Sequence, residues 1–270
     1  MGIVTWASLR CELLPSVEEP FFVGTKQLDK LMEMAHWLNR LQMVDECFIL
    51  NNTNLAAIMA RKFPGEYQEI KDTLPPWVLF FNIAGYEYLP EKRVSYLAKD
   101  MTDIAQRVGL EPAGAVGRVP APELLKAVQR PSKEPYWKLR YRGGCQDIFF
   151  ITINDKLPGL VATMNDMADE AGYAASEMGV YIQPIVQGVN CHCEFNLFYD
   201  PDSQSQSGRV RKLATSTINN LMAKGAFFSR PYGEGTDIIM NRDAASVAAL
   251  KKVKGILDPN NVMNPGKLCF

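Results

Sequence analysis

The chain has 270 residues, a length that suits one large domain or two of ordinary size. Hydrophobic residues make up 47% and charged residues 22%, which is typical of a globular protein and excludes a disordered chain. Lysine plus arginine number 29 and aspartate plus glutamate 30, so the net charge of −1 offers no electrostatic basis for binding nucleic acid or an anionic membrane.

The N-terminal region carries no targeting signal that we recognise. It lacks a basic start, and Arg10 and Glu12 interrupt any apolar core, so we expect no secretory signal peptide and a cytoplasmic protein. No apolar run approaches the roughly 18 residues that a membrane-spanning helix needs. None of the six cysteines forms a C-x-x-C pair, and in a reducing compartment we expect free thiols.

Hydrophobic periodicity predicts the elements of the first half of the chain. Strands are expected at 17–23, 47–50 and 77–86, and helices at 25–42, 54–61 and 91–108. Thr25 is the expected N-cap of the first of these helices, and Gly109 is expected to end the last. The proline-rich stretch 110–135, with a short helix at 121–129, is interpreted as the connection between two halves.

The second half repeats this rhythm. Strands are expected at 148–153, 179–188 and 191–200, the last two as a hairpin, and helices at 156–171, 209–224 and 243–254, the last ended by Gly255. The polar segment 200–208 is predicted to be a mobile loop. The alternation predicts an α+β fold: one large antiparallel sheet with helices on one face, built from two ferredoxin-like halves.

Phosphate-binding and metal-binding motifs are absent. No G-x-G-x-x-G precedes a helix, and no G-x-x-x-x-G-K-[ST] occurs. His36 lies in the middle of a predicted helix, and we interpret it as structural. On a strand, Cys191 and Cys193 share one face while His192 takes the other, so we predict no metal site.

The hairpin from residue 183 to residue 194 carries an unusual number of polar side chains. They are Gln183, Gln187, Asn190, His192 and Glu194. Unpaired polar groups on a buried sheet face cost about 1–3 kcal/mol each. These side chains therefore either pair with one another or line a binding site, in which case Gln183, Gln187 and Asn190 are the candidate substrate contacts.

A second candidate lies in the loop 225–235. Arg230 stands among aromatic residues and Pro231, where few side chains would solvate it. Its guanidinium either pairs with a nearby acid such as Glu234 or awaits an anion.

The C-terminal sequence, LKKVKGILDPNNVMNPGKLCF, indicates a family. Lys254, Asp258, Pro259 and the run from Asn264 to Lys267 reproduce a K-x-x-x-D-P-x-x-x-x-N-P-G-K pattern. This end resembles that of the FAD-linked oxidases and dehydrogenases of the vanillyl-alcohol oxidase / p-cresol methylhydroxylase superfamily.

The resemblance extends over nearly the whole chain and implies its domain organisation. Residues 1–16 would be the strand that leaves a flavin-binding domain, residues 17–208 the substrate or cap domain, and residues 209–270 the helices and turn that return to the flavin domain. The flavin-binding domain itself is expected to be absent from this chain. The chain would then be a separately encoded subunit or a piece of a longer protein. Its expected partner is a flavin-binding domain or subunit, and we expect the protein to form an oligomer.

The resemblance also implies roles for individual residues. The segment NCHCEFNLFYD places His192 at a flavin-facing position, without implying covalent attachment. The SRPY segment makes Arg230 the catalytic residue that stabilises an anion and Tyr232 a weaker candidate for contacting substrate. Asn264 and Lys267 lie in the turn that would approach the FAD cofactor.

The hairpin lacks the second histidine and the G-D-G-N-like run of the hydroxy-acid branch, which favours a phenol or an aryl alcohol as substrate. The expected function is therefore oxidation of a small substrate, an aromatic alcohol or phenol or else a hydroxy acid, by hydride transfer to FAD. Two alternatives remain: a non-catalytic accessory subunit, and a small-molecule binding module.

Overall fold

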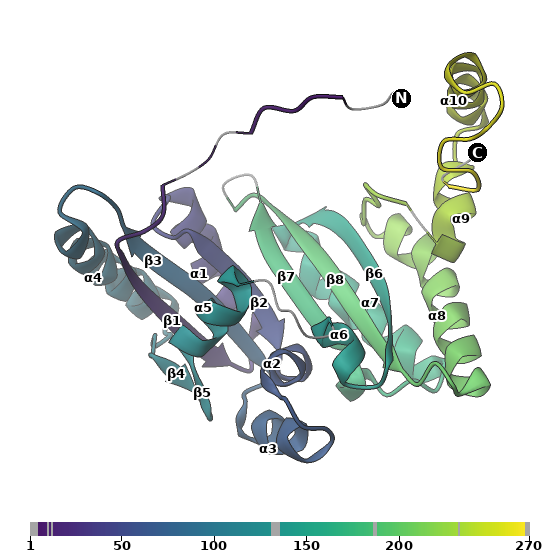
Figure 1. Cartoon of the computed structure of the whole chain (residues 1–270). Coiled ribbons are helices and arrows are strands. Elements are labelled where there is room, and N and C mark those ends of the chain that lie inside the picture. Colours follow the sequence, from purple (N-terminus) through teal and green to yellow (C-terminus); the bar gives the residue numbers. More distant parts are fainter. Residues whose placement is uncertain are drawn as a thin grey trace.

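The structure is a computed structural model of the chain (Figure 1). It describes residues 5–9, 11, 13–130, 136–185, 188–231 and 233–267, without the side chain of residue 234. Within these residues, no helix combines the length and the apolar character needed to cross a membrane.

The centre of the molecule is a six-stranded sheet in the order β1-β3-β2-β7-β8-β6. Every neighbouring pair is antiparallel, which confirms the predicted α+β class with one large antiparallel sheet. The strands are β1 (Val17–Thr25), β2 (Glu46–Asn51), β3 (Trp77–Gly85), β6 (Gly144–Ile153), β7 (Gly179–Ile185) and β8 (Asn190–Tyr199). A separate small ribbon joins β4 (Ala115–Val116) to β5 (Val119–Pro120).

The two halves of the sheet share one topology. In each half the third strand in sequence lies in the centre, giving β1-β3-β2 and β6-β8-β7, and β2 and β7 join the halves. Along the chain, each half therefore has its long helices and its strands in the order β-α-β-β-α.

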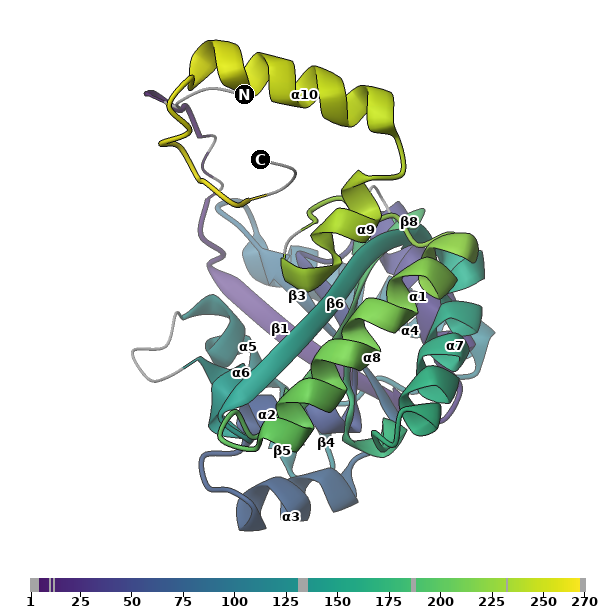
Figure 2. The same ribbon diagram turned by 90° about the vertical axis from the view of Figure 1, so that its right-hand side faces the viewer.

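Four long helices cover one face of the sheet (Figure 2). They are α1 (Leu28–Arg40), α4 (Pro90–Val108), α7 (Leu157–Glu170) and α8 (Gln204–Ala223). Their apolar stripes pack on alternate residues of the strands, such as Leu79, Phe150 and Phe195, none of which is exposed. This layer holds the larger of the two hydrophobic cores.

The other face is covered as well, although only in part. It holds a second core around Phe22, Phe80 and Phe198, against which α2 (Asn52–Met59) and α5 (Ala121–Gln129) pack. Two further helices lie nearby, α3 (Gly65–Thr73) and α6 (Trp137–Arg140). The prediction of helices on one face only was therefore wrong: α2 from the first half and α5 from the linker region form a second, smaller layer, because the aromatic side chains on this face also need burial.

Three local predictions need correction. The N-cap position of α1 is Gln27 and not Thr25, whose hydroxyl accepts a hydrogen bond from the Gln27 amide. The segment predicted as a mobile loop instead begins α8, because the Ser203 side chain accepts a hydrogen bond from the amide of Gln206. Gly255 does not end the last helix as predicted but lies inside α10 (Ala244–Leu257), whose C-cap residue is Asp258.

The two ends of the described chain extend beyond the sheet. Residues 5–9, 11 and 13–15 form no helix or strand, and in both views they lie on the same side of the molecule as α10 (Figures 1 and 2). A short helix, α9 (Thr236–Met240), leads from α8 towards α10. Apolar side chains are exposed at both ends: Trp6 is 82% exposed and Ile256 79%.

Candidate functional site

Polar side chains gather on one face of the β6-β8-β7 half, which we call the hairpin face. Along β8 burial alternates: Cys191, Cys193 and Phe195 point into the helix-covered core, whereas His192 and Glu194 point to the opposite side. The strand register then fixes the neighbours. The hairpin face consists of Asp147 and Phe149 from β6, Tyr181 and Gln183 from β7, and Asn190, His192, Glu194 and Asn196 from β8.

The imidazole of His192 has two aromatic rings as neighbours. Its ring centroid is 5.8 Å from that of Phe149 and 6.0 Å from that of Tyr181. Its side chain is 16% exposed, and its Nε2 lies 3.6 Å from Oε2 of Glu194. The imidazole and the carboxylate are therefore neighbours on the same face of β8.

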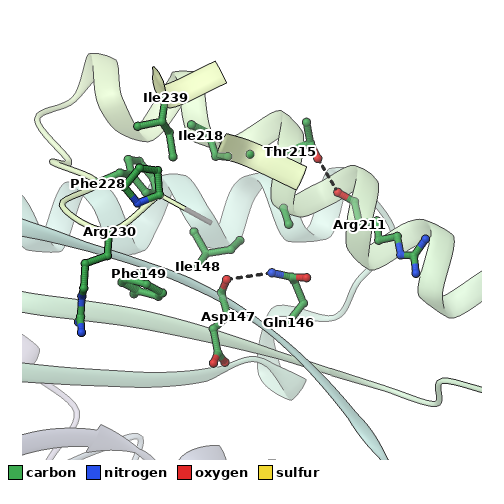
Figure 3. Close-up of a pocket in the computed structure, with 13 residues that line it drawn as sticks. Gln146, Asp147, Ile148, Phe149, Arg211, Thr215, Ile218, Phe228, Arg230 and Ile239 are labelled. Atoms are coloured by element: carbon green, nitrogen blue, oxygen red, sulfur yellow. Dashed lines mark hydrogen bonds between the residues drawn. The ribbon is translucent and has the colours of Figure 1, made fainter. Parts of the chain in front are cut away.

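Arg230 reaches the same place from a distant part of the sequence. After α8, Phe227 pairs with Ile151 on the edge of the sheet through two backbone hydrogen bonds of 2.8 and 2.9 Å. This pairing sets the course of the following loop, so that the Arg230 guanidinium lies over the ring of Phe149, with Cζ 5.1 Å from the centroid. Figure 3 shows the two side chains next to each other, with the carboxylate of Asp147 pointing in the same direction.

Phe149 is therefore the residue that His192 and Arg230 have in common. Among the residues that the structure describes, Arg230 forms no ion pair, and its side chain is exposed. The side chain of Glu234, its other candidate partner from the sequence, is outside the description. A cavity beside Phe149 is lined by Arg230, Asp147 and residues of α8.

A buried lysine organises the other end of the hairpin face. Lys138, on α6, is 6% exposed, and its Nζ donates to Oδ2 of Asp147 at 2.8 Å and to Oε1 of Glu194. Asn196 donates to both acids, at 2.7 Å and 2.6 Å. Its own Oδ1 accepts a bond of 2.8 Å from the buried Asn54. The side chains of these residues are fixed by several partners each, which makes the network rigid.

Electrostatics keep the lysine and the glutamate charged. Burial by itself raises the pKa of the Glu194 carboxyl, but the hydrogen-bonding groups around it, including His192 and Lys138, outweigh this and bring the pKa to about 2. Burial lowers the pKa of the Lys138 ammonium, but the carboxylates of Glu194 and Asp147 outweigh it and raise the pKa above its ordinary value.

The predicted substrate contacts of the hairpin, Gln183, Gln187 and Asn190, do not share one environment. Gln183 is the register partner of His192, is exposed, and accepts a hydrogen bond of 2.9 Å from the Tyr181 hydroxyl. Asn190 is half-buried and pairs with Ile185 at the end of the hairpin. Gln187 and Tyr232 lie outside the described residues, so the structure does not place them.

The two predicted cofactor residues at the C-terminus lie apart from this cluster. Asn264 and Lys267 are exposed in the turn beyond α10, where the Lys267 amide donates to the Asn264 carbonyl at 3.3 Å. Other residues of this region, Lys254, Asp258, Val262 and Met263, are joined by hydrogen bonds that we call the C-terminal clamp. The Asp258 carboxylate accepts from Lys254 and from the amides of Val262 (2.9 Å) and Met263 (2.8 Å). These bonds hold the turn that carries Asn264.

His36 has a structural contact, as its position in a helix suggested. Its Nδ1 lies 2.9 Å from the Gly188 carbonyl, next to the hairpin turn. The five cysteines in the described part of the chain are free thiols, as expected. In the same part, no group of three or more metal-binding side chains comes together.

A second pocket lies where α5 and α6 meet the sheet. Its volume is about 340 Å³, and most of its lining is apolar, with Phe48 and Tyr181 on the sheet and Leu124 on α5. Lys138 and Glu194 form the polar part of its wall. Tyr181, which lines this pocket, is also a neighbour of His192.

The sequence singled out His192, Glu194 and Arg230 but not Lys138, Asp147, Phe149 or Asn196. Asp147 directly precedes the apolar run of β6, and an acid at the start of such a run indicates a charge in need of a partner. Nothing local marks Lys138, which lies in an ordinary-looking WKLR run.

Comparisons with known proteins place this architecture in a class. Residues 154–268 match the family model described as FAD linked oxidases, C-terminal domain. Over these residues the chain is similar to the C-terminal domain of FAD-linked oxidases. No curated protein sequence matches the chain.

Solved structures extend the likeness to nearly the whole chain. A structure of p-cresol methylhydroxylase with bound substrate matches with a TM-score of 0.73 and 16% identity, over 95% of this chain and 53% of that one. The 4-ethylphenol oxidase of Gulosibacter chungangensis matches with a TM-score of 0.72 and 16% identity, over 94% and 54%. An alkyldihydroxyacetonephosphate synthase matches with a TM-score of 0.53 and 12% identity, over 94% and 45%.

These likenesses show that the chain shares its fold with part of p-cresol methylhydroxylase and of 4-ethylphenol oxidase. The chain spans about half the length of each of these three solved structures.

Proposed function

We propose that this chain is the substrate-cap portion of an FAD-dependent oxidoreductase that oxidises a small alcohol or phenol by hydride transfer to FAD. The observation that carries the proposal is the meeting of His192 and Arg230 at Phe149. Two groups from distant segments converge on one aromatic ring, and the similarity to a domain of FAD-linked oxidases supports a flavin as the reason for this convergence.

The residues present fit a flavin. A flavin ring is flat and gains negative charge when it is reduced, so it suits a surface with an aromatic side chain and an exposed guanidinium. Arg230 over Phe149 supplies both, and Arg230 forms no ion pair among the described residues that would compete for this role. When bound, FAD supplies a hydride acceptor next to the substrate carbon.

The chain's own residues then shape and charge the pocket. Arg230 holds negative charge on the reduced cofactor or on a substrate phenolate, and we propose that Tyr232 contacts the substrate. His192 faces the cofactor, and Asn264 and Lys267 approach it from the C-terminal turn. Gln183, Gln187 and Asn190 are the proposed substrate contacts at the hairpin.

An aromatic substrate is favoured over a hydroxy acid. Phe149 and Tyr181 flank His192 and offer flat apolar surfaces. The names of two proteins with this fold give p-cresol and 4-ethylphenol as their substrates. On that basis we propose a phenol or an aryl alcohol as the substrate of this chain.

The proposal requires a second part that holds most of the FAD. The chain spans about half of its structural relatives, and exposed apolar residues at both of its ends suit contact with another domain or subunit. Trp6 and Leu14 at the N-terminal side and Ile256 beyond the sheet are the clearest. We therefore propose a flavin-binding domain or subunit as partner.

The test is reconstitution. The chain purified alone is expected to bind FAD weakly or not at all, as measured by flavin absorbance. Co-expressed with a flavin-binding partner encoded beside its gene, it is expected to retain FAD and to oxidise 4-methylphenol with a dye as electron acceptor. Stoichiometric flavin on the chain alone would contradict the need for a partner. A complex that holds flavin but oxidises no alcohol or phenol would favour an accessory subunit, and a chain that binds phenols without any flavin would favour a binding module.

A further inference from the structure

The second pocket, which we call the α5–α6 pocket, has the size and the lining of a small-molecule site. Its volume is about 340 Å³, and its walls are mainly apolar with a few polar groups, as is usual for such sites. Leu50 of β2, Ile58 of α2 and Trp137 of α6 add to the apolar walls. Val128 and Tyr136, which also line it, are 46% and 57% exposed, so the pocket opens to solvent. The proposed function leaves this pocket without an occupant.

The polar groups in the wall of the α5–α6 pocket are already paired within the chain. Its charged lining residues, among those that the structure describes, are Lys138 and Glu194. The ammonium of Lys138 donates to Glu194 and, at 2.8 Å, to Asp147, while the Tyr181 hydroxyl donates to Gln183 at 2.9 Å. A charged ligand group would have to displace one of these partners, which is costly because a buried charge would then be unpaired. The pocket therefore favours an uncharged, apolar occupant.

The α5–α6 pocket adjoins the cluster around His192. Two of its lining residues are neighbours of the imidazole: the Tyr181 ring centroid lies 6.0 Å from that of His192, and Oε2 of Glu194 lies 3.6 Å from Nε2. In the strand register, Glu194 is the partner of Tyr181 on one side and of Phe149 on the other. Because neighbouring strands are about 4.8 Å apart, the backbones of Tyr181 and Phe149 are separated by roughly 10 Å. A molecule whose oxygen lies at Arg230 and Phe149 reaches the pocket only if it extends over about that distance.

We propose that the α5–α6 pocket holds an apolar substituent of the substrate, and that the chain thereby selects a phenol or aryl alcohol with a long side chain. The methyl group of 4-methylphenol ends well short of the pocket, whereas the end of the butyl chain of 4-butylphenol reaches it. Burial of the added methylene groups then favours the longer substrate. This inference rests on the proposed function for the position of the substrate oxygen. The affinity of the pocket for an apolar ligand depends on this chain alone.

Ethylbenzene, an apolar probe without a hydroxyl group, tests the pocket in the isolated chain. The methyl groups of Ile, Leu and Val are labelled with isotopes, and their NMR signals are followed as the probe is added. We expect the shifts to concentrate at Leu50, Leu124 and Val128, which line the pocket. Ala127→Phe places a ring in the pocket and should weaken binding about tenfold or more, whereas Glu123→Phe places the same ring on an exposed position of α5 outside the lining and should not. A native chain that shows no shift at these methyl groups, or shifts only at its exposed apolar ends, would overturn the proposal without any variant.

The reconstituted complex tests the link to the substrate. Its kcat/KM for 4-butylphenol is expected to exceed that for 4-methylphenol about tenfold or more. This preference should disappear in Ala127→Phe and persist in Glu123→Phe, and circular dichroism checks the folding of both variants. Equal kcat/KM values for the two phenols in the native complex would overturn the assignment of the substituent to the pocket. A complex that oxidises neither phenol would contradict the proposed function, and the ethylbenzene titration then still decides whether the pocket takes an apolar ligand.

Discussion

The guanidinium of Arg230 lies 5.1 Å from the ring centroid of Phe149, although the two residues are 81 positions apart in the sequence (230 − 149). The ring of Phe149 is also a neighbour of His192. The backbone pairing of Phe227 with Ile151 produces this arrangement, because it attaches the loop of Arg230 to the edge of β6. The predictions below concern this cluster, the buried network beside it and the C-terminal clamp.

Arg230→Ala should lower the turnover of the reconstituted enzyme more than its substrate affinity. Negative charge develops only as the reaction proceeds, so the guanidinium acts mainly in the transition state. We expect a loss of about 100- to 1,000-fold in kcat, the usual effect of removing one such charge-stabilising group. Steady-state kinetics with 4-methylphenol give the measurement. Arg118→Ala, which removes an exposed arginine paired with Glu69, is the control and should have native kinetics; a normal kcat in Arg230→Ala would refute the role.

Lys138→Met should destabilise the fold markedly. The substitution leaves the carboxylates of Asp147 and Glu194 facing each other without their buried ammonium. Breaking a buried ion pair by removing one partner costs about 3–5 kcal/mol of the free energy of unfolding. Urea unfolding of the isolated chain measures the loss. Lys126→Met, in an exposed pair, should cost at most about 1 kcal/mol, and equal losses in the two variants would contradict the prediction.

The network should also make stability depend on acid pH. The pKa of Glu194 is about 2 in the folded chain, below its ordinary value of 4.5, so its ionised form stabilises the folded state. That contribution is complete above 4.5 and is lost as the pH falls towards 2. In Glu194→Gln, unfolding free energies measured across this range should vary less with pH than in the native chain. A parallel dependence in both proteins would show that other acids account for it.

Asp258→Asn should loosen the C-terminal turn and leave the sheet intact. The carboxylate accepts hydrogen bonds from two backbone amides and from Lys254, and these bonds hold the pKa of Asp258 below its ordinary value. The amides of Val262 and Met263 should exchange hydrogen faster in the variant, while amides of β8 keep their protection. Asp243→Asn, which weakens the cap of α10 without touching the turn, serves as the comparison. Unchanged exchange at both amides would show that the clamp is dispensable.

Local sequence determined the elements and the alternation of faces. The helix at 91–108 and its end at Gly109 follow from periodicity and from a glycine that accepts a positive φ of 68°. The period of two in β8 predicted that His192 and Glu194 lie opposite the cysteines, and the structure confirms it. The start of α8 was missed because its first residues are polar and lack any apolar period, although Ser203 caps it.

The composition of the site was decided only by tertiary structure. Arg230 reaches Phe149 through pairing at the sheet edge, and Lys138 meets Asp147 and Glu194 because α6 folds over the hairpin face. Local propensity contains no information about such pairs, since a lysine in a short helix looks the same whether it faces water or two buried acids. The sequence determined that a charged hairpin and a C-terminal motif of an FAD-linked oxidase were present. Packing of both sheet faces determined which charges meet, because a buried charge is stable only where the fold brings it a partner.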